Sequence, residues 1–185
     1  MFQRLFGRER TSARALVDGL YGQIVAAARR PVLYAGFGVP DTPLGRYEMI
    51  SLHLFLFLHR TRDAEGPLAD VGQELTDRHF AEIDDALREL GIGDMAVPKR
   101  MKKLARMFYG RAQSYGEALD RSDRPALAAA LARNVRPDAP SWPQAPILAA
   151  YVEAARDALA RQPVDAFLAG RVEFADPGTV AGTPA

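Results

Sequence analysis

Few residues in this 185-residue chain can bind a metal, because it has three histidines and no cysteine. His53 and His59 lie six positions apart in one predicted helix, which turns their side chains about 240° away from each other. His79 has Glu82 near it in a second predicted helix, but two ligands fall short of a complete site. The sequence therefore predicts no metal site. It predicts histidines that are hydrogen-bonded in the core or lie at the surface.

Patterns for nucleophilic catalysis and phosphate binding are equally weak. No serine lies in a G-x-S-x-G sequence. The glycines at 36–38 and 91–93 lack the lysine that follows them in a phosphate-binding loop. Asp84 and Asp85 are adjacent in a predicted helix, so their carboxylates point apart and do not form a catalytic pair. We therefore expect a protein that is not an enzyme, with no catalytic residue and no cofactor.

The strongest pattern is a change of charge between two successive predicted helices. Residues 65–94 include nine acidic and two basic residues, a net charge of −7, whereas residues 95–116 include six basic and no acidic residues, a net charge of +6. One hypothesis is that the two helices pair as an antiparallel hairpin with complementary charges. The other is that Lys99, Lys103 and Arg106, at positions i, i+4 and i+7, form an exposed basic stripe for an anionic partner.

Aromatic residues follow the basic stripe. Phe108 and Tyr115 share the apolar side of the predicted helix, which favours a place in the core, whereas Tyr109 faces towards the basic residues. Gly110 costs about 1 kcal/mol relative to alanine inside a helix. One hypothesis is that such a glycine permits the close approach of another backbone, from a partner helix or from another helix of this protein. The other is that the helix simply tolerates it.

Helices separated by proline and glycine must position these residues. With 48% hydrophobic and 25% charged residues, the composition is typical of a soluble globular protein, and the length suits one domain. Apolar residues recur at helical spacing, and no convincing strand is present. The helices are predicted to begin at Ser12, Pro43, Pro67, Pro98, Pro125 and about Gln144, with a short turn at 164–169. The predicted fold class is all-α, a single-domain bundle of six or seven helices.

Two connections rich in proline interrupt the helical pattern, at 31–45 and at 136–146. Both are predicted to be irregular, and Trp142 is expected to anchor the second on the helical body. The apolar run Tyr47–Leu58 is shorter than the roughly 20 residues of a membrane span, so it is predicted to be a central core helix. The predicted boundaries are 1–11 for a basic N-terminal segment, 12–175 for the helical domain and 176–185 for a disordered tail.

Two blocks of the sequence resemble a known family. Residues 88–115, RELGIGDMAVPKRMKKLARMFYGRAQSY, and residues 38–60, GVPDTPLGRYEMISLHLFLFLHR, resemble the signature of the ubiquinol–cytochrome c chaperone family. The resemblance extends over roughly residues 16–176. It implies an α-helical, non-catalytic chaperone that binds newly made cytochrome b and assists assembly of the cytochrome bc1 complex, which is respiratory complex III.

The resemblance also implies a client-binding surface on the basic helix. Most of its residues match the family block, and the basic stripe supplies the others. The implied client-binding residues are Pro98, Lys99, Met101, Lys102, Lys103, Arg106, Phe108, Tyr109, Gly110 and Arg111. Such a surface combines apolar area that shields a client helix with charge that meets the loops of the client.

The family implies partners beyond cytochrome b. Its mitochondrial members work with a small partner protein and associate with the translating ribosome near the inner membrane, so both are further expected partners. This chain shows neither the presequence nor the membrane-tethering segment of that branch, and it resembles the compact bacterial form. We therefore expect a cytoplasmic protein that associates peripherally with the inner face of the bacterial inner membrane and does not bind DNA.

Two other functions compete with that of a client chaperone. The first is a helical RNA- or ribosome-binding module that uses the basic helix at 99–111. Its affinity would fall steeply with salt, because neutralised phosphates release counterions. The second is a helical bundle that binds a quinone or a lipid, which would co-purify with the protein. The net charge of the whole chain is only +1, so bulk charge does not indicate a nucleic-acid partner.

Overall fold

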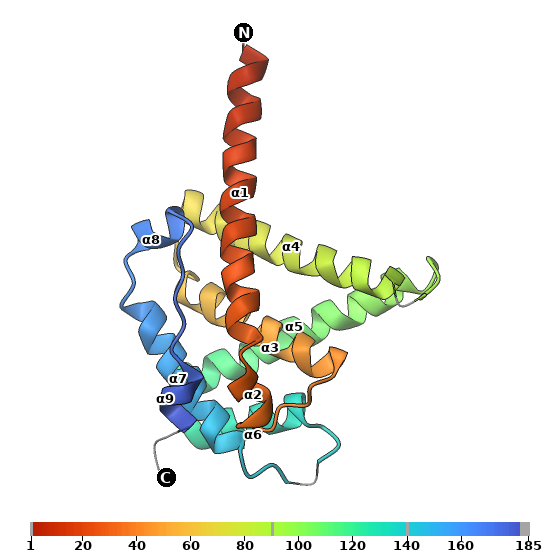
Figure 1. Cartoon of the computed structure of the whole chain (residues 1–185), viewed down its shortest axis with the longest axis vertical. Helices are drawn as coiled ribbons and strands as arrows, with labels where there is room; N and C mark the ends of the chain where they lie inside the picture. Colours follow the sequence, from red (N-terminus) through yellow and green to blue (C-terminus); the bar gives the residue numbers. More distant parts are fainter. Residues whose placement is uncertain (1, 90, 140, 182–185) are drawn as a thin grey trace.

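Helices form the architecture of the described part of the chain, residues 2–89, 91–139 and 141–181, in the computed structural model (Figure 1). No strand occurs within these ranges, so the predicted all-α fold is confirmed. The helices are α1 (Phe2–Ala28), α2 (Pro31–Ala35), α3 (Pro43–Arg60), α4 (Pro67–Glu89), α5 (Val97–Asp120), α6 (Arg124–Val135), α7 (Ala145–Ala160), α8 (Val164–Leu168) and α9 (Pro177–Ala181). Three of them, α2, α8 and α9, are only five residues long.

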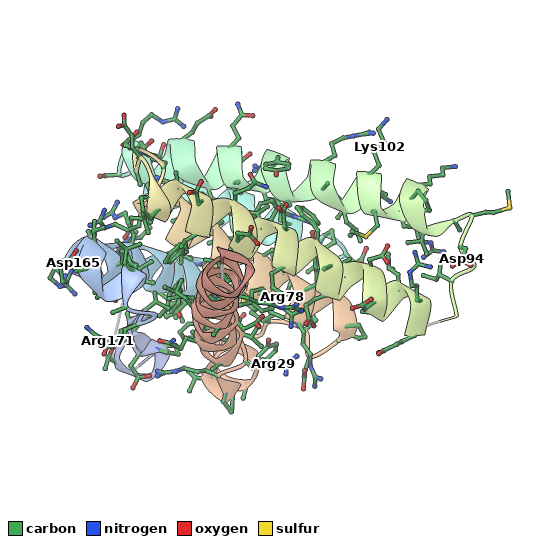
Figure 2. All side chains as sticks on the ribbon, turned by 90° about the horizontal axis from the view of Figure 1, so that it is seen from above. Arg29, Arg78, Asp94, Lys102, Asp165 and Arg171 are labelled. Carbon is green, nitrogen blue, oxygen red and sulfur yellow. The ribbon has the colours of Figure 1, made fainter. Side chains whose placement is uncertain are left out.

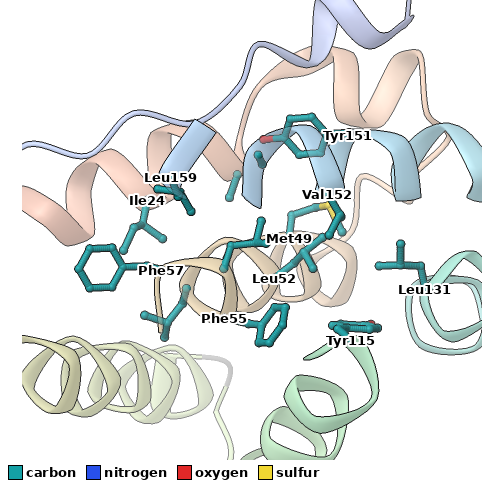
Figure 3. Packing of buried hydrophobic residues seen from close by; sticks show 14 of the residues in the cluster. Ile24, Met49, Leu52, Phe55, Phe57, Tyr115, Leu131, Tyr151, Val152 and Leu159 are labelled. Atoms are coloured by element: carbon teal, nitrogen blue, oxygen red, sulfur yellow. The ribbon is translucent and has the colours of Figure 1, made fainter. Parts of the chain in front are cut away.

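Helix α3 lies at the centre of the fold, as its apolar sequence predicts. It packs against α1, α4, α5, α6 and α7. Thr42 caps its start, where the Gly45 amide donates a hydrogen bond to the Thr42 hydroxyl over 3.1 Å. A side chain at Gly45 would lie 1.9 Å from the carbonyl oxygen of Pro40, so only glycine fits this first turn. Figure 3 shows Met49 and Phe55 of α3 among core residues from the surrounding helices.

Helices α4 and α5 form the hairpin that carries the two oppositely charged segments. Helix α4 is followed by Gly91, whose φ of 75° lies in the left-handed region that favours glycine. The Ile92 amide donates to the Leu87 carbonyl over 3.2 Å, and the Gly91 amide donates to the Arg88 carbonyl over 2.9 Å. These bonds form a glycine-based helix end.

The two irregular connections meet at Trp142. This side chain is buried, and its Nε1 donates a hydrogen bond to the carbonyl oxygen of Phe37 over 3.1 Å. The predicted anchoring of 136–146 is therefore confirmed. The prediction that all of 31–45 is irregular is wrong, because α2 forms one helical turn with Leu33 buried in the core.

Helical structure extends beyond both predicted boundaries of the domain, at residues 12 and 175. Helix α1 begins at Phe2, so Ser12 lies inside the helix instead of capping it. The predicted disorder of 176–185 is wrong for residues 176–181, and residues 182–185 lie outside the described residues. Helix α9 packs against α2 and α7, and Arg30 donates a hydrogen bond to Asp176 over 2.8 Å. These long-range contacts hold a segment whose composition alone favours disorder.

No helix in the described ranges is long and apolar enough to cross a membrane.

Candidate binding surface on helix α5

The basic stripe, defined as Lys99, Lys103 and Arg106, is exposed along the first half of α5. Lys102 beside it is also exposed and points away from α1 and α4 (Figure 2). None of these four side chains forms an ion pair within the described part of the chain. The stripe therefore offers free positive charge to a partner.

Helices α4 and α5 pair as the hairpin of the first hypothesis, but no ion pair between described residues holds them together. They meet instead through aromatic rings, with Phe80 of α4 and Phe108 of α5 edge to face at a centroid distance of 5.8 Å. The ring of His79 on α4 lies 5.8 Å from the same Phe108 ring. Aromatic side chains therefore occupy the contact face between the two helices, and most of the charged side chains of both helices are exposed.

Exposed apolar side chains surround the basic stripe. Met95, just before α5, is 98% exposed, and Tyr109 is 57% exposed. Met101 and Met107 are half-buried, so three of the five methionines of the chain lie on or next to this helix. Methionine is flexible and polarisable and adapts to apolar partners of different shape. Sequence reasoning selected Met101 but missed Met95 and Met107, although the concentration of methionine in this segment was a usable signal.

Gly110 lies open to solvent on the same helix. A Cβ atom added there would have no other atom of the protein within 4 Å, beyond the adjacent helix backbone. The alternative that this glycine permits close packing of two helices of this protein is therefore wrong. The ring of Tyr109 lies 5.3 Å from the ring of Phe108. Tyr109 therefore lies at the edge of the aromatic contact between α4 and α5.

Phe108 and Arg111 are among the client-binding residues that the resemblance implies, but they do not belong to the exposed surface. Phe108 is 2% exposed and packs in the core. The side chain of Arg111 is 12% exposed and forms an ion pair over 2.8 Å with Glu48 of α3. Pro98 is exposed at the start of α5, and of the other predicted residues outside Phe108 and Arg111 only Met101 is half-buried while the rest are exposed.

Comparison with known proteins identifies the family. The family model described as ubiquinol–cytochrome C chaperone matches residues 35–174. The chain belongs to the ubiquinol–cytochrome c chaperone family. The crystal structure of the Cbp3 homolog from Brucella abortus is 54% identical, covers 96% of this chain and 98% of that one, and superposes with a TM-score of 0.87. A search of curated proteins gives no match. The family match includes all of α3, α4 and α5, and so contains the whole candidate surface.

A buried ion pair lies beneath the surface of this chaperone-family protein. Burial raises the pKa of Glu48 to about 7, and the nearby positive charge of Arg111 opposes that rise. Arg111 Nε and Nη1 have no hydrogen-bond partner. The pair thus fixes Arg111 to the core at a cost in desolvation, which removes this cation from the exposed surface.

Two of the three histidines lie in the core, and the third, His59, is half-buried and hydrogen-bonded to Asp120 over 3.1 Å. His53 donates from Nδ1 to the Met49 carbonyl and accepts from the Tyr151 hydroxyl, both over 2.7 Å. His79 is hydrogen-bonded to Ser51 and Tyr21. Burial lowers the pKa of both histidines to about 4, so they are neutral at pH 7. In the ranges that the structure describes, no group of three His, Asp or Glu residues is placed to hold a metal ion.

Proposed function

We propose that this protein is a non-catalytic assembly chaperone that binds newly made cytochrome b during biogenesis of the cytochrome bc1 complex. The family membership supports the assignment to this assembly process. In the proposal, the protein works in the cytoplasm at the inner face of the membrane, where a nascent membrane subunit is accessible. The client binds to the exposed part of α5.

The observation that carries the proposal is the unpaired basic stripe beside exposed apolar side chains. Lys99, Lys103 and Arg106 lack partners in the described chain, and Met95 and Tyr109 expose large apolar side chains next to them. Charge left unpaired on a helix is available for carboxylates of a client. Exposed methionine and tyrosine bury apolar area when a client helix docks.

Gly110 supplies the place of closest approach. The open space over this residue lets the backbone of a client helix lie closer to α5 than any side chain would allow. Tyr109, directly beside it, is the aromatic anchor in this arrangement, because aromatic residues contribute a large share of the energy of many interfaces.

The test is crosslinking to cytochrome b in native membranes from a photoreactive residue placed at Tyr109. The variant with Lys99→Glu, Lys103→Glu and Arg106→Glu is expected to lose the crosslink while its thermal melt stays unchanged. The matched control is Arg121→Glu, Arg161→Glu and Arg171→Glu, which changes the net charge equally at three other exposed sites. Equal crosslinking by both variants would remove the basic stripe from the client surface.

A second pair of variants tests the role of Gly110. Gly110→Leu is expected to abolish capture of cytochrome b without loss of stability, since leucine is the better helix former by about 0.8 kcal/mol. Gly22→Leu is the control, because Gly22 also lies in a helix with no atom within 4 Å of an added Cβ. Normal capture by the folded Gly110→Leu variant would show that the client lies elsewhere.

The same unpaired stripe also favours RNA or the ribosome as a partner. Three cations that neutralise phosphates of single-stranded RNA would give a slope of about −2 for log affinity against log salt. Affinity for purified ribosomes that follows this slope, together with no crosslink to cytochrome b, would favour the RNA-binding function.

A further inference from the structure

A groove with an apolar floor runs between α1 and α4. It has a volume of about 1190 Å³ and is lined by five residues of α1 between 13 and 18, by residues between 67 and 81 of α4, and by Leu168 of α8. Its floor includes Leu16 and Val17 of α1 and Val71 of α4. In Figure 1, these three helices meet on the side of α4 that faces away from α5. The groove therefore lies apart from the basic stripe.

The α4 wall of the groove carries three exposed carboxylates, which we call the acidic stripe: Asp70, Glu74 and Asp77. They follow each other at i, i+4 and i+7, so they share one face of the helix. None of them forms an ion pair in the described part of the chain; Asp77 accepts a hydrogen bond from Gln73 over 2.9 Å. The wall offers free negative charge directly above an apolar floor.

Two arginines also line the groove, but both already face carboxylates. Arg78 lies between Asp18, at 3.3 Å, and Glu82, at 2.7 Å. Arg14 lies 4.0 Å from the same Asp18. Their positive charge is compensated locally, so among the described residues that line the groove only the acidic stripe carries charge without an ion-pair partner.

We propose that this groove is the docking site for a cationic amphipathic helix of a partner protein. Apolar side chains at i, i+3, i+4 and i+7 of such a helix pack on the floor, as in other helix-in-groove complexes. Its lysine or arginine side chains, spaced by the same helical repeat, meet the acidic stripe. Anionic lipid and nucleic acid are poor occupants, because the stripe repels phosphate. This inference is independent of what α5 binds.

The probe for this site is a fluorescein-labelled 18-residue peptide of leucine and lysine in a helical pattern. A matched peptide with glutamate in place of lysine is the negative control. Fluorescence anisotropy with the full chain is expected to show binding of the leucine–lysine peptide at least about tenfold tighter than binding of the control. Comparable affinity for the two peptides would overturn the proposal.

Neutralising the acidic stripe locates the binding. The variant Asp70→Asn, Glu74→Gln and Asp77→Asn is expected to weaken binding of the leucine–lysine peptide about tenfold, as three exposed ion pairs would. The matched variant Glu65→Gln, Asp85→Asn and Glu89→Gln makes the same change of net charge at exposed sites outside the groove, and should bind normally. Equal weakening by both variants would show attraction by overall charge and overturn the proposal.

Filling the groove tests the apolar floor. Ala81 is exposed and lines the groove, so Ala81→Trp is expected to block the peptide. Ala86→Trp places the same ring at an exposed position of α4 outside the lining and is expected to leave binding intact. Circular dichroism checks that both variants are folded. Unchanged binding of the peptide by folded Ala81→Trp would overturn the proposal. Self-association of the chain that the acidic-stripe variant abolishes would also overturn it, because a second copy of the chain would then occupy the groove.

Discussion

The acidic stripe on α4 and the basic stripe on α5 have the same helical spacing, lie on the two arms of one hairpin, and do not touch. Asp70, Glu74 and Asp77 border a groove with an apolar floor, whereas the basic stripe lies on an outer helix face beside Met95 and Tyr109. Spacing alone makes the two stripes equivalent. The neighbouring residues distinguish them: the acidic stripe borders a groove, whereas the basic stripe is part of an open surface.

The contact between the arms explains why the charges stay apart. Phe80 and Phe108 fill the interface between α4 and α5, and charged side chains are excluded from it. The exception on α5 is Arg111, which is buried against Glu48 of α3 and not against α4. The comparison teaches that opposite charge on two paired helices does not mean that ion pairs hold them together when an apolar contact face is available.

The largest effect is expected when the buried cation of α5 is removed. Arg111→Met leaves the Glu48 carboxylate buried without its partner, so the free energy of unfolding at pH 8 should fall by about 4 kcal/mol. Lys103→Met, on the exposed stripe of the same helix, should change it by less than about 0.5 kcal/mol. Urea denaturation measures both. Similar values for the two variants would contradict the distinction between paired and free cations on α5.

The second largest effect is expected when the aromatic contact between α4 and α5 is removed. Phe108→Ala removes a buried ring between the arms and should lower the free energy of unfolding by about 3–4 kcal/mol. Tyr109→Ala, at the exposed neighbouring position, should cost less than about 1 kcal/mol, and it serves as the control. A small effect of Phe108→Ala in a urea melt would mean that the hairpin is not held by its aromatic rings.

The pH dependence of stability should reveal the buried carboxyl group. The pKa of Glu48 is raised from 4.5 to about 7, so the folded state binds a proton that the unfolded state releases. The stabilising contribution of this proton is complete below pH 4.5 and is lost as the pH rises to 7, an effect on the order of 3 kcal/mol.

Glu48→Gln should remove that part of the pH dependence. Urea melts of both proteins between pH 4.5 and 8 measure it, and the difference between them should level off above pH 7. A constant difference over the whole range would show that Glu48 stays ionised throughout, with Arg111 compensating its burial.

The smallest effect is expected for the basic stripe itself. The variant with Lys99→Glu, Lys103→Glu and Arg106→Glu should shift the free energy of unfolding by no more than about 0.5 kcal/mol, because no ion pair is lost in the described chain. Melts at low and high salt provide the measurement. If the triple variant were markedly destabilised at low salt and less so at high salt, attraction between the oppositely charged helices would contribute to the stability of the hairpin.

Local signals in the sequence were enough for most of the fold. Prolines and caps placed the starts of α3, α4 and α6, and Gly91 placed the end of α4. Helices α2 and α9 were missed because long-range contacts, such as that between Arg30 and Asp176, stabilise them. A local pattern of proline and glycine carries no information about such contacts.

For the candidate surface too, local patterns in the sequence were informative, whereas contacts between helices were not predictable. Helical spacing gave an exposed basic stripe as one of two hypotheses, and the apolar pattern already favoured a core position for Phe108. The burial of Arg111 depends on Glu48 from another helix, and the groove depends on how α1 packs on α4. Both arise from tertiary packing, which the order of residues along one helix does not reveal.

Trp142 gives the molecule a built-in optical reporter. It is the single tryptophan of the chain, and its buried indole joins the 136–144 connection to Phe37. Arg136 ties the same two connections together by donating to the Gly38 carbonyl over 3.4 Å. The intrinsic emission of the indole should therefore shift to longer wavelength when these two segments separate. Comparison of this red shift with loss of helical circular dichroism would reveal whether the junction opens before the helices unfold.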